Sequence, residues 1–234
     1  VGSGGIAFAP GVRAGPWVFA NGVVASDLGA EAGNAAFDAG WPQPGRPHYY
    51  REGVALLGRA QAILASGGAD LSRCVRLDQF YPGPEPVAFY QRARRDVFGG
   101  YIAPSTSIVE RALIVPDASI SVDFMALRGD AGGAIETFYP PALEVPAGAG
   151  FAPVVRAGGF VFIAGMLAAH QPGDVGGIAP EARMPAGHLW KGIPIELEAD
   201  YIMARKIKPA LEAAGLGFPD VVKVQAYLSD MADV

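Results

Sequence analysis

The chain of 234 residues is long enough for one large or two small domains, each with its own core. Hydrophobic residues make up 51% and charged residues 18%, which excludes a disordered protein, and the net charge of −5 argues against a dedicated nucleic-acid binder. A single cysteine, Cys74, excludes a disulfide framework within the chain, and no apolar run reaches the roughly 18 residues that a membrane helix needs. We therefore expect a soluble, cytoplasmic protein that binds neither nucleic acid nor a membrane.

The first half of the chain predicts seven elements in the order β-β-α-β-α-β-β. Apolar residues at helical spacing predict the first helix, and the glycine pair Gly67 and Gly68 predicts its end. Alternation in "CVRLDQFY" predicts a strand that places Val75 and Leu77 on one face. In chain order we expect strands at 11–14 and 17–24, a helix at 50–65, a strand at 74–81, a helix at 85–98, and strands at 105–115 and 119–127.

The chain also repeats part of itself. The segment "FAPGVRAGPWVFANGVVA" at 8–25 returns as "FAPVVRAGGFVFIAGMLA" at 151–168, with eleven of the eighteen positions identical. Two strands within 151–168, a helix at about 195–214 and a strand at 221–228 then follow the order of the first copy, the last two at an offset of 147 residues. We expect domain boundaries as follows: a first domain at 1–130, a Gly/Pro-rich linker at 131–149 and a second domain at 150–234.

The second copy is expected to be incomplete. At the offset of 147 residues Val234 corresponds to Val87, whereas the first copy continues to Leu127, about 40 residues further. A second domain without its last helix and two strands would have unpaired sheet edges. We therefore expect the remainder to be disordered, trimmed or supplied by a second polypeptide that completes the domain.

Three stretches, "ILASGGADLSRCVRLDQFY", "IAPSTSIVERALIVPDASISVDFMAL" and "LEAAGLGFPDVVKVQAYLSDMADV", carry a resemblance to a known family. Together with the element order, they resemble the Rid family of reactive-intermediate (enamine and imine) deaminases, also called YjgF-like and formerly labelled L-PSP endoribonucleases. The resemblance implies an α+β, chorismate-mutase-like fold, a mixed sheet with helices on one face, here repeated in tandem. It also implies a homo-oligomer of trimeric or pseudo-trimeric symmetry, with small-molecule clefts between neighbouring units.

Thr106 and Ser121 occupy the two positions at which the resemblance implies the most consequential changes. In family members that hydrolyse 2-aminoacrylate-type enamines, an Arg in a Pro-x-Arg context clamps the substrate carboxylate, and Thr106 stands at that position. A hydroxyl cannot form the two-bonded ion pair that a guanidinium forms with a carboxylate. The family's Glu, which positions the hydrolytic water, corresponds to Ser121. The first copy is therefore not expected to be an ordinary 2-aminoacrylate deaminase.

The remaining family positions have also changed. The family's Asn on the second helix corresponds to Gln91, its Tyr before the first strand to Phe8, and the small polar residue before the first-strand Gly to Asn21. In the second copy the last two positions hold Phe151 and Ala164. We expect Gln91, Asn21 and Phe8 to contact a ligand.

Hydroxyl side chains suggest a different cleft in the first copy. Thr106, Ser107 and Ser121, together with Ser105, would line a cleft near Asn21 and Gln91 that binds a neutral polar ligand or supplies a nucleophile. The alternative is that these are ordinary strand residues with satisfied hydroxyls. No His or Lys is placed by sequence to act as a base, although Asp123 and Glu110 on neighbouring strands could help.

Arg13 and Arg156 are the shared arginine of the repeated "VRAG". They are candidates for ligand binding, and the alternative, which we favour, is that they stabilise the sheet edge. The three histidines, His48, His170 and His188, lack metal-ligand spacing, so we expect no metal site and no cofactor.

The resemblance implies a Rid-like hydrolase or deaminase of a small C–N metabolite, such as an enamine or imine. The alternative is a small-ligand-binding or scaffold protein that has lost its catalytic charges. RNA cleavage, the activity in the old family label, is disfavoured because the chain is acidic and has no acid/base pair of histidines.

Overall fold

The computed structural model describes residues 9–25, 47–143, 145–146, 148–169, 177–185, 193–230 and 233. Within the first half, the β-β-α-β-α-β-β order predicted from the sequence is confirmed. The elements are β1 (Val12–Ala14), β2 (Trp17–Val23), α1 (His48–Ser66), β3 (Cys74–Tyr81), α2 (Val87–Phe98), β4 (Ser105–Val109) and β5 (Ser121–Leu127).

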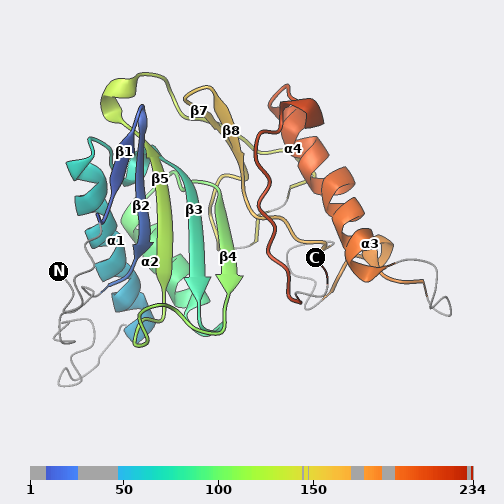
Figure 1. Cartoon of the computed structure of the whole chain (residues 1–234), viewed down its shortest axis with the longest axis horizontal. Coiled ribbons are helices and arrows are strands. Elements are labelled where there is room, and N and C mark those ends of the chain that lie inside the picture. The colour runs from blue at the N-terminus through green and yellow to red at the C-terminus, as the bar shows by residue number, and fades with distance from the viewer. Residues whose placement is uncertain are drawn as a thin grey trace.

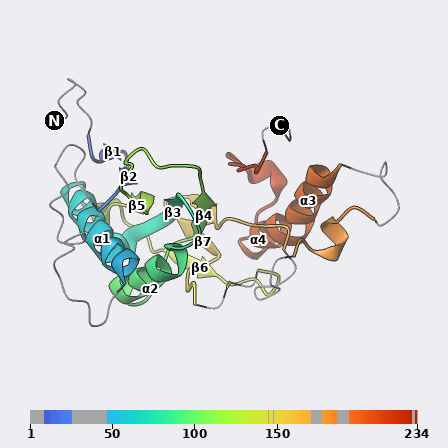
Figure 2. The ribbon, with the colours of Figure 1, turned by 90° about the horizontal axis from the view of Figure 1, so that it is seen from below.

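The five strands of this half form one mixed sheet in the order β1-β2-β5-β3-β4. Only the pair of β3 and β4 is parallel within this sheet, and the other neighbours are antiparallel. Both helices lie on one face of the sheet, as Figures 1 and 2 show from two directions. The α+β class with helices on a single face is thus confirmed for this half. We call the face opposite α1 and α2 the outer face.

The core between the helices and the sheet follows from the apolar periodicity of α1 and the alternation of β3. Leu57 and Leu64 of α1 are fully buried against Leu77 of β3 and Phe124 of β5 in one cluster. Fully burying a side chain of this size stabilises the fold by about 1.5–3 kcal/mol. This cluster fixes which residues of each strand point to the outer face. The prediction that Val75 shares a face with Leu77 was wrong, because the pairing of β3 with β5 shifts between Cys74 and Arg76 and Val75 is buried in a separate cluster with Trp17 and Leu127.

The strand predicted at 105–115 is shorter than expected and ends at Val109. Val109 pairs with Tyr81, the last residue of β3, and the Glu110 amide donates to the Tyr81 carbonyl at 2.8 Å. Beyond that bond β3 has ended, so the chain no longer has a neighbour with which to continue the ladder.

A second sheet follows the first along the chain and has three strands in the order β6 (Glu136–Phe138), β7 (Val154–Ala157) and β8 (Phe160–Ile163). All its pairs are antiparallel, and β6 falls within the segment expected to be a linker. The helix predicted at about 195–214 is present as α3 and α4, joined by a π-helical turn at Met203–Ile207. The helices are α3 (Pro194–Ile202) and α4 (Lys208–Ala213).

The hairpin β7–β8 reproduces the hairpin β1–β2. Arg13 pairs with Val18 in the first, and Arg156 pairs with Val161 in the second, so the register is the same. The two hairpins also meet, because the Trp17 ring lies edge-on to Phe160, with the ring centroids 6.1 Å apart. The repeated sequence therefore forms the same local structure twice.

Gly158, in the turn of the second hairpin, allows this contact. Its φ is +55°, and a Cβ there would lie 2.7 Å from the Trp17 ring. Leu127 and Val155 are buried in the same cluster as Trp17, so the second sheet packs on the outer face beside Trp17 and Leu127.

The strand predicted at 221–228 is not formed. These residues carry no ladder pairing within the part of the chain that the structure describes. The side chains of Val222 and Val224 are 81% and 72% exposed. In Figure 1 the segment descends from the end of α4 beside the first sheet. A strand needs a neighbour for its backbone groups, and none of the described strands pairs with this segment. We call residues 221–228 the tail segment.

No helix among the described residues is both long enough and apolar enough to cross a membrane.

Candidate functional site

Three polar side chains form a row across the outer face of the first sheet. Asp78 of β3 pairs with Thr106 of β4 on one side and with Asp123 of β5 on the other. Side chains directly opposite each other on neighbouring strands share a face, and Leu77 and Tyr81 of β3 are buried on the helix side. Asp78 alternates with them, so we call Thr106, Asp78 and Asp123 the polar row on the outer face. All three are partly buried.

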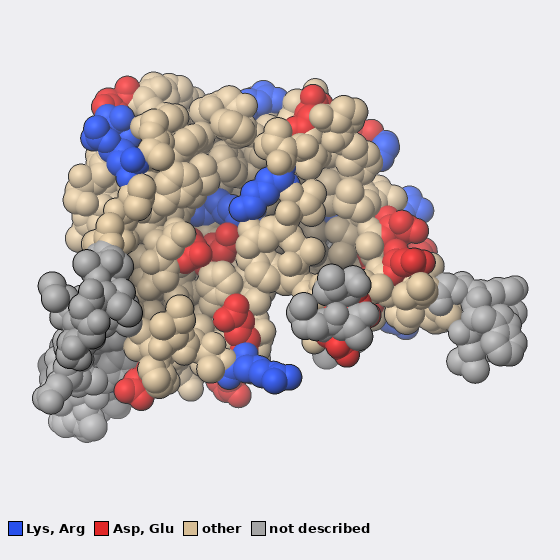
Figure 3. Space-filling view, in the orientation of Figure 1, with Lys and Arg blue, Asp and Glu red and all other residues tan. Residues whose placement is uncertain are grey.

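Arg76 forms an ion pair with one of the two carboxylates. Its Nε donates to Asp78 Oδ2 at 2.8 Å and its Nη2 donates to Asp78 Oδ1 at 3.0 Å, which is a two-bonded pair. Figure 3 shows acidic and basic side chains next to each other over the middle of this face. The guanidinium of Arg76 is therefore occupied by a carboxylate of the protein itself.

Asp123 has a different environment. Its Oδ1 accepts a hydrogen bond of 2.6 Å from the backbone N–H of Gly22, which lies at an irregularity in the pairing of β2 with β5 and has a φ of +63°. Burial raises the pKa of the Asp123 carboxyl, and the charges of Asp78 and Glu110 raise it further, while the Gly22 bond opposes the shift. A half-buried carboxyl with a raised pKa is the kind of group that serves as a general base.

Two glycine positions shape the space around the row. Gly22 supplies the N–H described above, and Gly165 lies against Thr106. A Cβ at position 165 would come within 2.7 Å of Thr106 Cγ2 and 3.0 Å of Thr106 Oγ1. The Gly165 N–H also donates to the Ser105 carbonyl at 3.1 Å. The segment after β8 therefore forms a wall of the site beside β4, and only a residue without a side chain fits there.

The structure divides the hydroxyl cleft predicted from the sequence between the two faces of the sheet. Ser121 pairs with Phe80, two residues beyond Asp78, so it lies on the outer face with Thr106. Ser105 and Ser107 pair with Leu77 and Gln79 and lie on the helix side. Thr106 and Ser121 are therefore brought to one face, whereas Ser107 is separated from them by the sheet.

The predicted ligand-contacting residues lie at several places. Gln91 is on α2, which covers the opposite face of the sheet, and Arg13 is exposed on the edge strand β1. Asn21 is exposed on β2 beside Gly22, so it is next to the residue that binds Asp123. Phe8 lies outside the described residues. Of this group, Asn21 is the one that the chain brings next to the polar row.

Arg156 makes structural contacts. Its Nη1 donates to Glu136 Oε2 at 2.9 Å, its Nη2 donates to the carbonyl of Ala214, and its guanidinium lies 5.1 Å from the centre of the Phe138 ring. These contacts connect β7 to β6 and to the end of α4. They support the structural alternative for this arginine over ligand binding.

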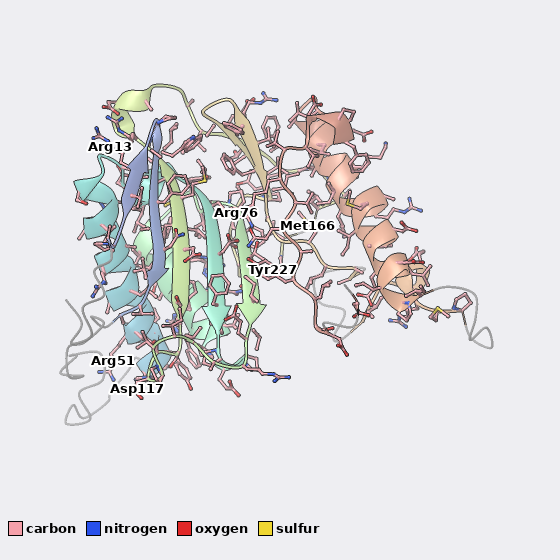
Figure 4. The ribbon with its side chains drawn as sticks, viewed as in Figure 1. Arg13, Arg51, Arg76, Asp117, Met166 and Tyr227 are labelled. Atoms are coloured by element: carbon pink, nitrogen blue, oxygen red, sulfur yellow. The ribbon has the colours of Figure 1, made fainter. Side chains whose placement is uncertain are left out.

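Arg76, Asp78 and the tail segment were not predicted from the sequence as parts of this site. Arg76 Nη2 donates to Gln225 Oε1 at 3.4 Å, and Gln225 Nε2 donates to the Tyr227 hydroxyl. Figure 4 shows Arg76 and Tyr227 close to each other beside the sheet. The alternation of "CVRLDQFY" could have placed Arg76 and Asp78 on the outer face. The approach of the tail segment had no sequence signal, because it depends on how the two halves pack.

Among the residues that the structure describes, no group of three or more His, Cys, Asp or Glu side chains is arranged to hold a metal ion.

No family model matches the chain, and no curated protein matches it. Solved structures do resemble it, each over about half of its length. One, from Mycobacterium tuberculosis, is described as a member of the highly conserved YjgF/YER057c/UK114 family; it is 19% identical, with 54% of this chain and 96% of that chain covered and a TM-score of 0.40. The structures that the chain resembles are those of the Rid (YjgF) family.

Two further solved structures are similar to the chain over about the same share of its length. Escherichia coli TdcF, solved with bound serine, is 15% identical, with 55% of this chain and 92% of that chain covered and a TM-score of 0.41. Yeast Mmf1 is 12% identical, with 54% and 91% covered and a TM-score of 0.42. Identities this low bear on the fold alone, so the function has to be argued from the site.

Proposed function

We propose that the protein is a hydrolase of small imines or related C–N compounds and that the polar row is where it acts. The observation that supports this most directly is the juxtaposition of Thr106, Asp78 and Asp123 on one face. It combines a hydroxyl, a carboxylate held by Arg76 and a carboxyl whose pKa is raised. The family resemblance supplies the reaction class, and these residues supply groups that suit it.

In the proposed reaction, water adds to the carbon of a protonated imine. Asp123 accepts a proton from the attacking water as general base, and the Thr106 hydroxyl orients that water. Asp78 faces the cationic substrate and stabilises its charge. In the net reaction, one iminium ion and one water give one carbonyl compound and one ammonium ion. The two carboxyls of the row suit a substrate that is cationic when it reacts.

The same residues predict that the substrate has no carboxylate. Thr106 stands where the resemblance implies a carboxylate-binding arginine, and Arg76 already binds Asp78 through two hydrogen bonds. A substrate carboxylate bound at the polar row would also lie beside the negative charges of Asp78 and Asp123, which would repel it. We therefore propose imines of simple amines rather than 2-imino acids.

A pair of imines generated in the assay tests this proposal. An amine oxidase acting on benzylamine yields an imine without a carboxylate, and an amino-acid oxidase acting on alanine yields 2-iminopropionate. The measurement is carbonyl formation above the spontaneous rate for each imine. We expect acceleration with the first imine and little with the second. Acceleration of 2-iminopropionate alone would contradict the proposed preference, and acceleration of neither would contradict hydrolysis and favour a ligand-binding protein.

Variants of two aspartates make the test specific to the polar row. Asp123→Asn keeps an oxygen for the Gly22 N–H but removes the base, so we expect a rate loss of about 10²-fold or more. The matched control is Asp117→Asn, in the exposed turn between β4 and β5, away from the row (Figure 4), and we expect it to leave the rate unchanged. Equal activity of the two variants would remove Asp123 from the mechanism.

We also propose that residues 150–234 form a second unit of the same kind and that the protein assembles with trimeric or pseudo-trimeric symmetry. Support comes from the identical registers of the two hairpins and from α3 and α4, which fall where α1 falls at the offset of 147 residues. A second polypeptide would be a component of such an assembly if it completes this unit. Native mass spectrometry measures the number of chains in the assembly and detects any second polypeptide. A single monomeric species would contradict the proposed assembly.

A further inference from the structure

A chain of hydrogen bonds connects the polar row to the second half of the protein. Asp78 accepts two hydrogen bonds from Arg76, Arg76 donates to Gln225 Oε1, and Gln225 donates through Nε2 to the Tyr227 hydroxyl. Asp78 and Arg76 belong to β3, while Gln225 and Tyr227 belong to the tail segment. Four residues from two distant parts of the sequence therefore form one chain of hydrogen bonds.

The direction of these bonds determines what Tyr227 can do. The Tyr227 oxygen is the acceptor of the bond from Gln225, so its own O–H proton points elsewhere and can be donated. Burial raises the pKa of Tyr227, and the charges of Asp78, Asp123 and Glu110 raise it further, against the opposing effect of Arg76. A phenol in this environment stays protonated through the neutral range and is a hydrogen-bond donor rather than a base.

We propose, on the basis of the function proposed above, that Tyr227 is a catalytic residue of this site and donates a hydrogen bond to the oxygen that water contributes to the substrate. Gln225 is a positioning residue, since it holds the Tyr227 oxygen and is itself held by Arg76. The second half of the chain then completes the site that the first half begins.

The proposed steps balance as follows. Water adds to the carbon of the iminium ion while Asp123 takes one proton, which gives a neutral carbinolamine. Asp123 passes that proton to the nitrogen and takes the hydroxyl proton, which gives a zwitterion with an alkoxide oxygen and an ammonium nitrogen. Tyr227 stabilises that alkoxide oxygen. The C–N bond then breaks to give the carbonyl and ammonia, and ammonia takes the proton from Asp123. Donors placed where negative charge develops act on the rate rather than on ground-state binding.

The test compares two tyrosine variants in the full chain, with the imine formed from benzylamine as the probe. Tyr227→Phe removes only the hydroxyl, and we expect kcat to fall about 10²-fold, with KM changed by less than about twofold. The matched control is Tyr139→Phe, just after β6, where the side chain is 64% exposed, and we expect no change. A Tyr227→Phe variant as active as the wild type would overturn the inference and leave the proposed function standing.

Gln225→Glu tests the positioning role separately. The new carboxylate keeps an acceptor for Arg76 but cannot donate to Tyr227, so we expect a smaller loss of kcat than in Tyr227→Phe. Combining the two substitutions should cost no more than Tyr227→Phe alone, because Gln225 acts through Tyr227. Losses that simply add would overturn this positioning role.

The pH dependence of the activity distinguishes a catalytic role of Tyr227 from a purely structural one. Because the pKa of Tyr227 is raised above its ordinary value of 10.0, the activity of the wild type should fall only at a pH above that value, where the Tyr227 proton is lost, and this alkaline fall should be absent in Tyr227→Phe. Titration of ¹³C-labelled tyrosine by NMR gives the same pKa without turnover. If the wild type accelerates neither imine, the proposed function and this inference both fail. A Tyr227 resonance that titrates as in an unfolded peptide would overturn the inference alone.

Discussion

The strand β3 and the tail segment are similar in sequence and different in structure. At the offset of 147 residues Val75 and Leu77 correspond to Val222 and Val224. Val75 and Leu77 are fully buried in a strand with β4 on one side and β5 on the other, whereas Val222 and Val224 are exposed in a segment that pairs with none of the described strands. The same alternation therefore forms a central strand only where neighbouring strands are present to pair with it.

The two hairpins give the opposite result. The hairpins β1–β2 and β7–β8 keep the same register, and Gly15 and Gly158 in their turns have the same φ of +55°. A hairpin depends on its own turn and on two strands that are adjacent in sequence. Local information is thus sufficient for the hairpin, while a central strand needs partners that are distant in the chain.

Alanine substitutions at the corresponding positions Leu77 and Val224 should differ strongly in their effect on stability. Leu77→Ala should lower the free energy of unfolding by about 2–5 kcal/mol, because it removes a fully buried side chain and leaves a cavity. Val224→Ala should change it by less than about 0.5 kcal/mol, since that side chain is exposed. Urea unfolding monitored by circular dichroism measures both. A loss above about 1 kcal/mol for Val224→Ala would show that the tail segment is covered in solution.

The sequence predicted the elements whose signals are local. The periodicity of α1, the alternation of β3 and the Gly/Pro turns placed the elements of the first half to within a few residues. The end of β4 at Val109 was not predictable in this way, because it follows from where β3 stops. The tail segment was wrongly predicted to be a strand for a similar reason. Its alternation is a local signal, whereas a strand also needs partner strands that are distant in the chain.

The site was only partly predictable. Thr106 and Ser121 were found through the family resemblance, and strand alternation is enough to separate them from Ser107. Asp78 becomes a candidate only when Thr106 and Asp123 are known to be its neighbours on the adjacent strands. Tyr227 was out of reach, because a contact between residues as far apart in the chain as Arg76 and Gln225 leaves no periodic pattern.

The two halves also differ in charge at one pair of corresponding positions. In β3 the residue is Asp78, which lies opposite Asp123, whereas in the tail segment it is the uncharged Gln225. The substitution Asp123→Asn tests what the neighbouring charge of Asp78 does to stability. The folded protein raises the pKa of Asp123 above its ordinary value of 3.8, so it binds that proton more tightly than the unfolded chain. Stability from this group is therefore present below about pH 3.8 and is lost as the pH rises through the folded pKa. At pH 7 the Asn variant should therefore be more stable than the wild type.

Urea unfolding between about pH 3 and pH 8 measures this effect, with Asp117→Asn as the control for a generic loss of one carboxylate. The gain in Asp123→Asn should shrink as the pH falls, because the wild-type carboxyl becomes protonated and the two proteins become alike in charge. A variant that is less stable than the wild type at neutral pH would mean that the Gly22 hydrogen bond outweighs burial and the nearby charges of Asp78 and Glu110.

Arg13 and Arg156, the shared arginines of the two hairpins, are expected to contribute little to stability. Arg156→Ala removes the bonds to Glu136 and Ala214, and the cost should be about 1 kcal/mol or less, because this ion pair is exposed on both sides. Arg13→Ala, on an exposed edge strand, should cost less than about 0.3 kcal/mol. Raising NaCl to about 1 M should reduce the Arg156 effect, since salt screens an exposed pair. Equal costs for the two substitutions would mean that the hairpins share the role of this arginine as well as their register, and the difference between the halves would then begin only after the hairpin.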